Sequence, residues 1–183
     1  MNIFVLDECP VQSAQMQCDK HVVKMVLESA QMLSTAHRML DGELVIGLSP
    51  TGRKQKQWVL PDQREEVMYK VAHPGHPCTI WTMESRENYD WHFEHFFALC
   101  REYQKRYNKQ HLCEKKLLGH LCDTPKNIPQ RGQTPFAIAM QANPECILNN
   151  AVESYRCYYK IAKKRFAKWE RGTEAPAWWQ GEE

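Results

Sequence analysis

The chain has 183 residues, 43% hydrophobic and 25% charged, as is typical of a globular protein with a full-sized core. It has no run of 18 apolar residues, which excludes a membrane-spanning helix, and its start lacks the positive segment of a signal peptide. We therefore expect an intracellular, cytoplasmic protein with no membrane partner. The formal net charge is +2, but residues 1–100 carry a balance of −4 and residues 101–183 a balance of +6. One end of the molecule should therefore be able to meet a polyanion.

The first third of the chain predicts an extended segment, a long helix and a polar loop. Residues 2–6 fit a short strand or an extended arm. The helix should run from about residue 10 to 40, with a break near Cys18, and stop at Gly42 with a left-handed exit. Residues 41–66, rich in glycine and polar residues, predict a mobile loop insertion or a hairpin with basic residues at its tip.

Potential metal ligands precede the next helix. His73, His76 and Cys78 have suitable side chains, but the chain shows no second pair of ligands with zinc-site spacing. The eight cysteines include no Cys-x-x-Cys, which favours reduced thiols over a disulfide framework. We expect neither a metal nor another cofactor, and an irregular turn that leads into a helix over residues 78–108.

This second long helix carries polar side chains at helical spacing. Asn88, His92 and His95 share one face with neighbouring aromatic residues. Such a stripe forms either a solvated face or one wall of a substrate-binding pocket.

A short helix should follow over His111 to Leu121, before two proline-stiffened loops. Lys126 and Asn127 lie in the first of these loops, between two prolines. They could hold a phosphate or a base of a ligand, or the loop could only route the chain between helices.

The last predicted helix, residues 144–171, has an aromatic face and a basic face. Tyr155 and Tyr159 belong to the aromatic face, which should be buried. The basic face comprises Arg156, Lys160, Lys163, Lys164, Arg165, Lys168 and Arg171. Such density of positive charge is typical of a phosphate-binding surface, although it also suits a solvated face. DNA is the expected partner, and Lys160, Lys163 and Lys164 are candidate contacts.

Together these elements predict a mainly α protein. We expect a single-domain helical bundle over residues 1–183, with irregular Pro/Gly-rich loops, at most a small strand element, and a tail at 172–183. The sequence leaves the oligomeric state open.

The first helix contains a candidate acid–base pair. His21 and Glu28 are seven residues apart and so lie on one helical face, at the edge of the apolar stripe. Burial of such a pair shifts pKa values and suits acid–base chemistry. The alternative is a hydrogen-bonded structural pair at the rim of the core.

Two segments resemble a known family. The start Met-Asn-Ile-Phe and the run Cys-Asp-Lys-His-Val-Val-Lys-Met-Val-Leu-Glu resemble the N-terminal region of the bacteriophage endonuclease V group, the pyrimidine-dimer DNA glycosylases. That group carries His-Leu-x-x-Glu-x-x-Glu on its first long helix, and its second Glu is the catalytic acid. With the histidines aligned at His21, this residue corresponds to Glu28, whereas Met25 replaces the first Glu. Tyr155 to Lys160 are similar to the aromatic tail that the family uses near its substrate.

The resemblance implies a chemistry. An N-terminal α-amine attacks C1′ of a damaged nucleotide and forms a Schiff base, and the glutamate assists bond breaking and elimination. An α-amine has a pKa of about 7.7–8.0, so part of it is unprotonated at neutral pH. The family exposes Thr at position 2 by removing the initiator methionine, whereas this chain has Asn2. The amine would thus come from Met1, or from Lys20 or Lys24.

The function expected from the sequence is a DNA-binding glycosylase and AP lyase, acting on a damaged or modified base through an amine and a glutamate. One alternative is an enzyme that processes nucleotides or modified bases in a pocket walled by Asn88, His92 and His95. The other is a non-enzymatic module that binds nucleic acid or a protein partner through its basic face.

Overall fold

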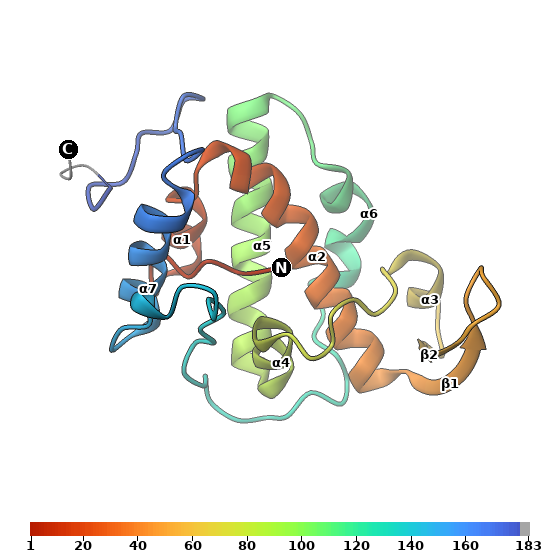
Figure 1. Ribbon diagram of the computed structural model, residues 1–183. Coiled ribbons are helices and arrows are strands. Elements are labelled where there is room, and N and C mark those ends of the chain that lie inside the picture. The colour runs from red at the N-terminus through yellow and green to blue at the C-terminus, as the bar shows by residue number, and fades with distance from the viewer. Residues whose placement is uncertain (180–183) are drawn as a thin grey trace.

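The computed structural model describes residues 1–179. Within these residues the fold is mainly helical with one two-stranded antiparallel hairpin, which confirms the expected fold class (Figure 1). The helices are α1 (Pro10–Gln15), α2 (Asp19–Asp41), α3 (Arg64–Val67), α4 (Pro77–Glu84), α5 (Arg86–Tyr107), α6 (Leu112–Leu121), the 3₁₀ turn η1 (Pro144–Cys146), α7 (Ala151–Tyr158) and the π-helical turn η2 (Tyr159–Lys163); the strands are β1 (Glu43–Leu48) and β2 (Lys54–Val59). None of the described helices is long and apolar enough to cross a bilayer.

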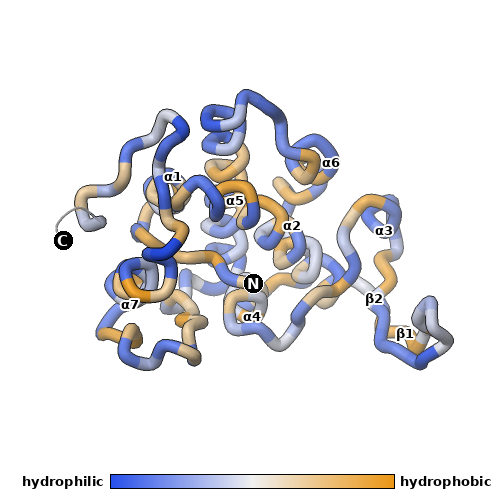
Figure 2. The backbone as a smooth tube through the Cα atoms, turned by 45° about the horizontal axis from the view of Figure 1, so that its top comes forward, coloured by the Kyte–Doolittle hydropathy of each residue, from blue (hydrophilic) through white to orange (hydrophobic). Residues whose placement is uncertain are grey.

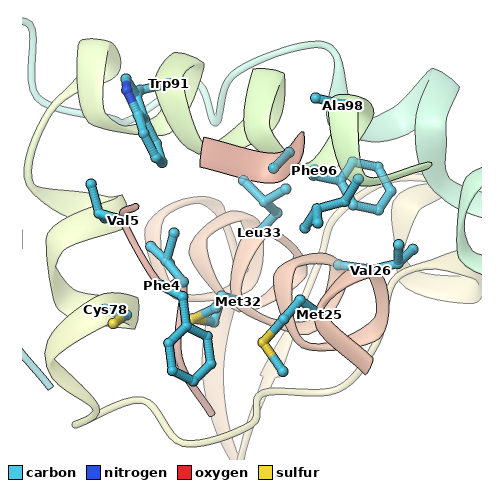
Figure 3. Packing of buried hydrophobic residues seen from close by; sticks show 14 of the residues in the cluster. Phe4, Val5, Met25, Val26, Met32, Leu33, Cys78, Trp91, Phe96 and Ala98 are labelled. Atoms are coloured by element: carbon cyan, nitrogen blue, oxygen red, sulfur yellow. The ribbon is translucent and has the colours of Figure 1, made fainter. Parts of the chain in front are cut away.

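The core lies between α2 and α5, the two longest helices of the described chain. Apolar side chains of α2, among them Val26 and Leu33, are fully buried and face Phe96 of α5 (Figure 3). The extended N-terminal arm, residues 2–6, brings Phe4 and Val5 into the same cluster. Burial of each large side chain contributes about 1.5–3 kcal/mol, so this cluster holds the arm against both helices.

The predicted break in the first helix is confirmed, because α1 ends at Gln15 and α2 begins at Asp19. The predicted left-handed exit at Gly42 is wrong, because this residue is extended, with φ −89° and ψ 155°. A Cβ atom at Gly42 would lie 2.5 Å from the carbonyl oxygen of Arg38. Close approach of backbone, rather than a positive φ, therefore requires glycine here.

The helix expected over residues 78–108 is two helices, α4 and α5. Ser85 separates them with φ −153° and ψ 160°. Its Oγ accepts a hydrogen bond from Asn88 N at 3.1 Å and caps the N-terminus of α5. Helical periodicity continues through Ser85, so the capping geometry was the feature that periodicity alone did not reveal.

The helix expected over residues 144–171 is also too long. It comprises η1, α7 and η2, and it ends at Lys163. The chain beyond it turns back to the start of α2, where Lys168 O accepts from Asp19 N at 2.9 Å and Glu170 N donates to Asp19 Oδ2 at 2.8 Å. Pairing with the α2 N-terminus therefore replaces continuation of the helix.

The loop expected over residues 41–66 contains the β1–β2 hairpin, in which Leu44 pairs with Trp58, and helix α3. The predicted tail is irregular over 172–179, and Trp179 packs on Trp169 with 5.0 Å between ring centroids. Residues 180–183 lie outside the described residues.

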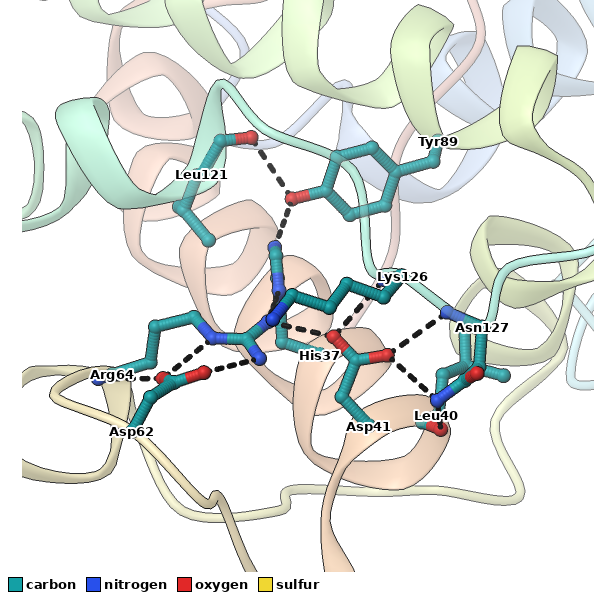
Figure 4. A network of polar contacts seen from close by, with 9 residues as sticks. All are labelled: His37, Leu40, Asp41, Asp62, Arg64, Tyr89, Leu121, Lys126 and Asn127. Carbon is teal, nitrogen blue, oxygen red and sulfur yellow. Dashed lines mark hydrogen bonds and ion pairs between the residues drawn. The ribbon is translucent and has the colours of Figure 1, made fainter.

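A polar network joins the C-terminal end of α2 to α3 and to the loop after α6 (Figure 4). His37 contacts Tyr89 Oη at 2.8 Å and Arg64 Nη1 at 2.9 Å. Arg64 also binds Asp41, whose carboxylate accepts from the backbone N–H groups of Lys126 and Asn127 at 3.0 Å each. Lys126 and Asn127, candidate ligand contacts in the sequence, thus have a structural role in this network.

Among the described residues, no three His, Cys, Asp or Glu side chains come together as a metal cluster. His76 instead caps α4, where its Nδ1 accepts from Cys78 N at 3.2 Å. All eight cysteines are free thiols, and five of them are buried.

Candidate active site

A cleft of about 680 Å³ opens where the N-terminal arm crosses α2. The far end of the chain forms its opposite wall, through α7 and the residues that follow η2. The lining residues are Met1, Asn2, Phe4, Lys20, His21, Lys24, Met25, Glu28, Ala139, Tyr158, Lys163, Arg165 and Phe166. Four of these side chains are cationic and one, Glu28, is acidic, so the cleft is suited to an anionic ligand.

The N-terminal arm is fixed in place by buried hydrogen bonds. Asn2 Nδ2 donates to Ala139 O at 2.9 Å, and Gln17 Nε2 donates to Ile3 O at 3.0 Å. Phe4 has φ 57°, a left-handed conformation that costs a non-glycine residue about 1–3 kcal/mol. Its ring stacks on His21 with 4.4 Å between centroids, and this packing offsets the strain.

Glu28 lines the cleft and is 9% exposed. Its Oε2 accepts from Asn2 N at 3.0 Å and lies 3.7 Å from the Met1 α-amine. Its Oε1 pairs with Lys24 Nζ at 3.1 Å. The carboxylate is therefore held in one orientation by donors on both oxygens, next to a primary amine.

His21 is buried and lines the same cleft as Glu28, seven residues earlier on α2. Its Nδ1 forms a hydrogen bond with the hydroxyl of Tyr159. Burial, followed by the positive charges of Lys163 and Lys24, lowers the pKa of His21 to about 3. The imidazole is therefore neutral at pH 7, and it can donate or accept a hydrogen bond without carrying a charge.

Two lysines of the cleft lining lie next to aromatic rings of the same lining. Lys163 Nζ lies 4.3 Å from the centre of the Tyr158 ring and donates to the Tyr158 hydroxyl at 3.0 Å. Lys20 Nζ lies 5.7 Å from the centre of the Phe166 ring. This combination provides ammonium groups for phosphates and ring faces for a sugar or base.

Replacement of Tyr159 by phenylalanine should destabilise the protein by about 1–3 kcal/mol, because it removes the hydroxyl partner of a buried imidazole nitrogen. Urea unfolding followed by circular dichroism measures the change. Tyr158→Phe is the matched control, because its hydroxyl bonds only a half-buried lysine, and it should cost less than about 0.5 kcal/mol. Equal losses in the two variants would contradict a structural role for the His21–Tyr159 pair.

The structure brings together six of the site residues expected from the sequence. Met1, Lys20, His21, Lys24, Glu28 and Lys163 all line the cleft. Tyr159 does not line the cleft, but its hydroxyl forms a hydrogen bond with His21 Nδ1. Tyr155 is buried, and its hydroxyl accepts from Ala139 N at 3.2 Å and donates to Ala137 O at 2.8 Å.

Other expected residues lie away from the cleft. Lys160 lines a separate groove beside Trp178, and Lys164 is exposed outside the cleft lining. Asn88, His92 and His95 are fully buried. Asn88 Nδ2 donates to Trp81 O at 2.7 Å, His92 Nδ1 lies 2.7 Å from Thr82 Oγ1, and His95 Nδ1 lies 3.0 Å from Pro10 O. These three side chains hold α4, α5 and α1 together and form no wall of the cleft.

The sequence analysis did not select several lining residues, among them Asn2, Phe4, Ala139, Arg165 and Phe166. The sequence predicts a continuous helix through Arg165 and Phe166, with Arg165 on its basic face. The end of that helix at Lys163 brings both to the same cleft. Only position 2 carried a usable signal, since the resembling family places its amine there.

The family model described as pyrimidine dimer DNA glycosylase matches residues 1–115. These residues include the arm and all of α2, and hence Met1, His21 and Glu28. No curated protein and no solved structure matches the chain. Because the match spans more than half of the chain and contains the central residues of the cleft, the protein belongs to the pyrimidine dimer DNA glycosylase family.

Proposed function

We propose that this protein excises a damaged pyrimidine from DNA through its N-terminal α-amine, with Glu28 as the acid–base partner. One observation carries the proposal: the Met1 α-amine lies 3.7 Å from Glu28 Oε2, and both residues line a cationic cleft. A nucleophilic amine needs a nearby group that accepts and returns protons, and a fixed carboxylate meets this requirement.

The reaction follows from these two groups. The lone pair of the unprotonated amine forms a bond to C1′ of the nucleotide, and the C1′–N glycosidic bond breaks, so that the base leaves with its electron pair and takes up a proton from the solvent. Glu28 accepts the proton that the amine loses. It then returns a proton to the ring oxygen as the C1′–O4′ bond opens to a Schiff base. Removal of a C2′ proton leads to β-elimination, in which the 3′ phosphate leaves.

The other cleft residues can bind the DNA around the damaged nucleotide. Lys20, Lys163 and Arg165 can contact the phosphates that flank the damaged nucleotide. Phe4 and Phe166 provide apolar surfaces against its sugar and base. Held between these groups, C1′ would meet the amine without diffusion of either reactant.

The nucleophile depends on whether the initiator methionine is retained. In the full chain the Met1 amine faces Glu28, and Asn2 N–H donates to the same Oε2 at 3.0 Å. Removal of Met1 would convert Asn2 N into a primary amine at this shorter distance. Both forms keep an α-amine beside Glu28, and the intact mass of the purified protein distinguishes them.

Borohydride trapping on a duplex with an abasic site tests the proposal. Reduction of the Schiff base should link the DNA to the protein, and mass spectrometry of the digested adduct should locate the link at the N-terminal amine. Protein with a chemically acetylated N-terminus is the control and should give no adduct. A link at Lys20 or Lys24 would contradict the assigned nucleophile, and absence of any adduct on bound DNA would contradict the Schiff-base step.

The two alternatives from the sequence receive less support. A nucleotide-processing pocket walled by Asn88, His92 and His95 would need these side chains at a cavity, whereas each is buried and bonded to neighbouring helices. A purely binding module would leave the amine–carboxylate pair without a role.

A further inference from the structure

The β1–β2 hairpin projects from the end of α2, beside α3 and away from α5 and α7 (Figures 1 and 2). One face of it carries aliphatic side chains that are about half or more exposed: Leu44, Ile46 and Leu48 are 49%, 63% and 65% exposed. Alternation along β1 places all three on the same face. A contiguous apolar stripe of this kind on a projecting element marks an interaction surface.

The same face carries positive charge. The strand register places Lys54 opposite Leu48, Lys56 opposite Ile46, and Trp58 opposite Leu44. Directly opposed residues of an antiparallel pair share a face, so each exposed aliphatic residue has a lysine or a tryptophan at its side. Both lysines are exposed, and Arg53 precedes them at the turn. The opposite face carries uncharged Gln55 and Gln57.

The hairpin is anchored rigidly at its base. Arg38 of α2 is fully buried and donates to Trp58 O at 2.9 Å, to Tyr69 O at 2.7 Å and to Met68 O at 3.0 Å. It also forms an ion pair with Glu65, whose Oε2 accepts from Leu60 N at 2.9 Å. An isolated two-stranded hairpin is only marginally stable, and this anchor fixes its direction relative to α2.

We propose that this face, defined by Leu44, Ile46, Leu48, Lys54, Lys56 and Trp58, binds duplex DNA that flanks the nucleotide in the cleft. Lysine ammonium groups would contact backbone phosphates, and the aliphatic and aromatic side chains would pack against sugars and base edges. A two-stranded ribbon fits a DNA groove. The choice of DNA rather than a protein rests on charge complementarity, because the only acidic residue of 43–59 is Glu43, on the opposite face.

The spacing agrees with a DNA partner. Glu28 and the end of α2 at Asp41 are 13 residues apart, which is about 20 Å along a helix. This distance equals about six base pairs of DNA. A duplex seated in the cleft and parallel to α2 would therefore reach the hairpin about six base pairs from the damaged nucleotide. The inference deepens the proposed function, since it assumes that the cleft binds DNA.

Binding to a long and a short duplex tests the inference. Both carry a central tetrahydrofuran abasic analogue; the 30-base-pair duplex reaches the hairpin, whereas the 10-base-pair duplex extends only about 17 Å to each side. Replacing both Lys54 and Lys56 by alanine should weaken binding of the long duplex about tenfold at low salt. It should also reduce the slope of log affinity against log salt by about 2. Binding of the short duplex should stay unchanged.

Two further variants make the result specific to the proposed face. Ile46→Ser combined with Leu48→Ser should also weaken binding of the long duplex alone. The control, Gln55→Ala with Gln57→Ala, changes the opposite face and should bind as the wild type does. An unchanged salt slope in the lysine variant, an equal loss in the control, or a change in sedimentation that shows self-association through this face would each overturn the inference.

Borohydride trapping on a further 10-base-pair duplex, in which a natural abasic site with a C1′ aldehyde replaces the tetrahydrofuran, separates this inference from the proposed function. Its failure in every protein, with the long-duplex difference intact, would overturn the Schiff-base chemistry and leave the hairpin contact standing. Trapping that succeeds while the hairpin variants bind long DNA normally would support the Schiff-base chemistry and overturn the hairpin contact.

Discussion

Replacement of Glu28 by glutamine is expected to lower the rate of base excision by about 10²–10⁴-fold, the usual contribution of a general acid–base group. Glutamine keeps the shape of the side chain and one oxygen that can accept from Asn2 N. It cannot take up a proton from the α-amine, so the loss should fall on the chemical step. Single-turnover excision of a damaged pyrimidine from a labelled duplex measures the rate.

Binding must be measured beside the rate, because Glu28 is also an ion-pair partner of Met1 and Lys24. The dissociation constant for lesion-containing DNA should change less than about tenfold, and removal of a negative charge from a cationic cleft should strengthen rather than weaken binding. Glu94→Gln, at an exposed position on α5 that does not line the cleft, makes the same charge change and should leave the rate unaltered. Wild-type excision by the Glu28 variant would show that another group moves the proton.

Mild acid is expected to unfold the protein. Four histidines are buried as neutral groups: burial lowers the pKa of His21 to about 3 and the pKa values of His37 and His95 to about 4, and that of His92 well below its usual value. In the unfolded chain each imidazole has a pKa of about 6.5. Below pH 6.5 the unfolded state therefore binds more protons, and the free energy of unfolding falls as the pH drops toward 4.

The effect should be large because the four contributions add. Each fully protonated imidazole of the unfolded chain contributes about 1.4 kcal/mol per pH unit, so the four together contribute about 5 kcal/mol per pH unit near pH 5. A typical stability of about 5–15 kcal/mol would be exhausted within about 1–3 pH units below 6.5. Carboxylates such as Asp62, whose pKa the hydrogen bonds from Arg64 lower to about 2, add to the loss only at lower pH.

Urea unfolding at a series of pH values between 7.5 and 4.5 measures this slope. His37→Gln removes one of the four groups and should reduce the slope by about a quarter. Asn88→Ala is the control: it removes a buried polar side chain that does not titrate, so it should lower stability at every pH without changing the slope. A midpoint that stays constant from pH 7 to pH 5 would contradict the prediction.

The sequence by itself determined the features that depend on local periodicity and local chemistry. The apolar spacing of α2 places His21 and Glu28 on one face whatever the remainder of the chain does, because the period of a helix is constant. The break before Asp19 is predicted because about 30 residues is long for one helix of a globular protein, and the glycines and polar residues of 41–66 predict a loop or a hairpin there. Local periodicity did not reveal the boundary between α4 and α5 at Ser85, because a serine within a periodic run becomes a cap only when the backbone turns there.

Tertiary structure alone decided which polar residues meet. Asn88, His92 and His95 form the same stripe whether they line a pocket or cross-link helices; packing against α1 and α4 made them structural. Conversely, Met1, Glu28 and Lys163 are far apart in the sequence, and the cleft exists because the N-terminal arm and the turn after α7 close over α2. Contacts between distant segments depend on the whole core, and no local pattern encodes them.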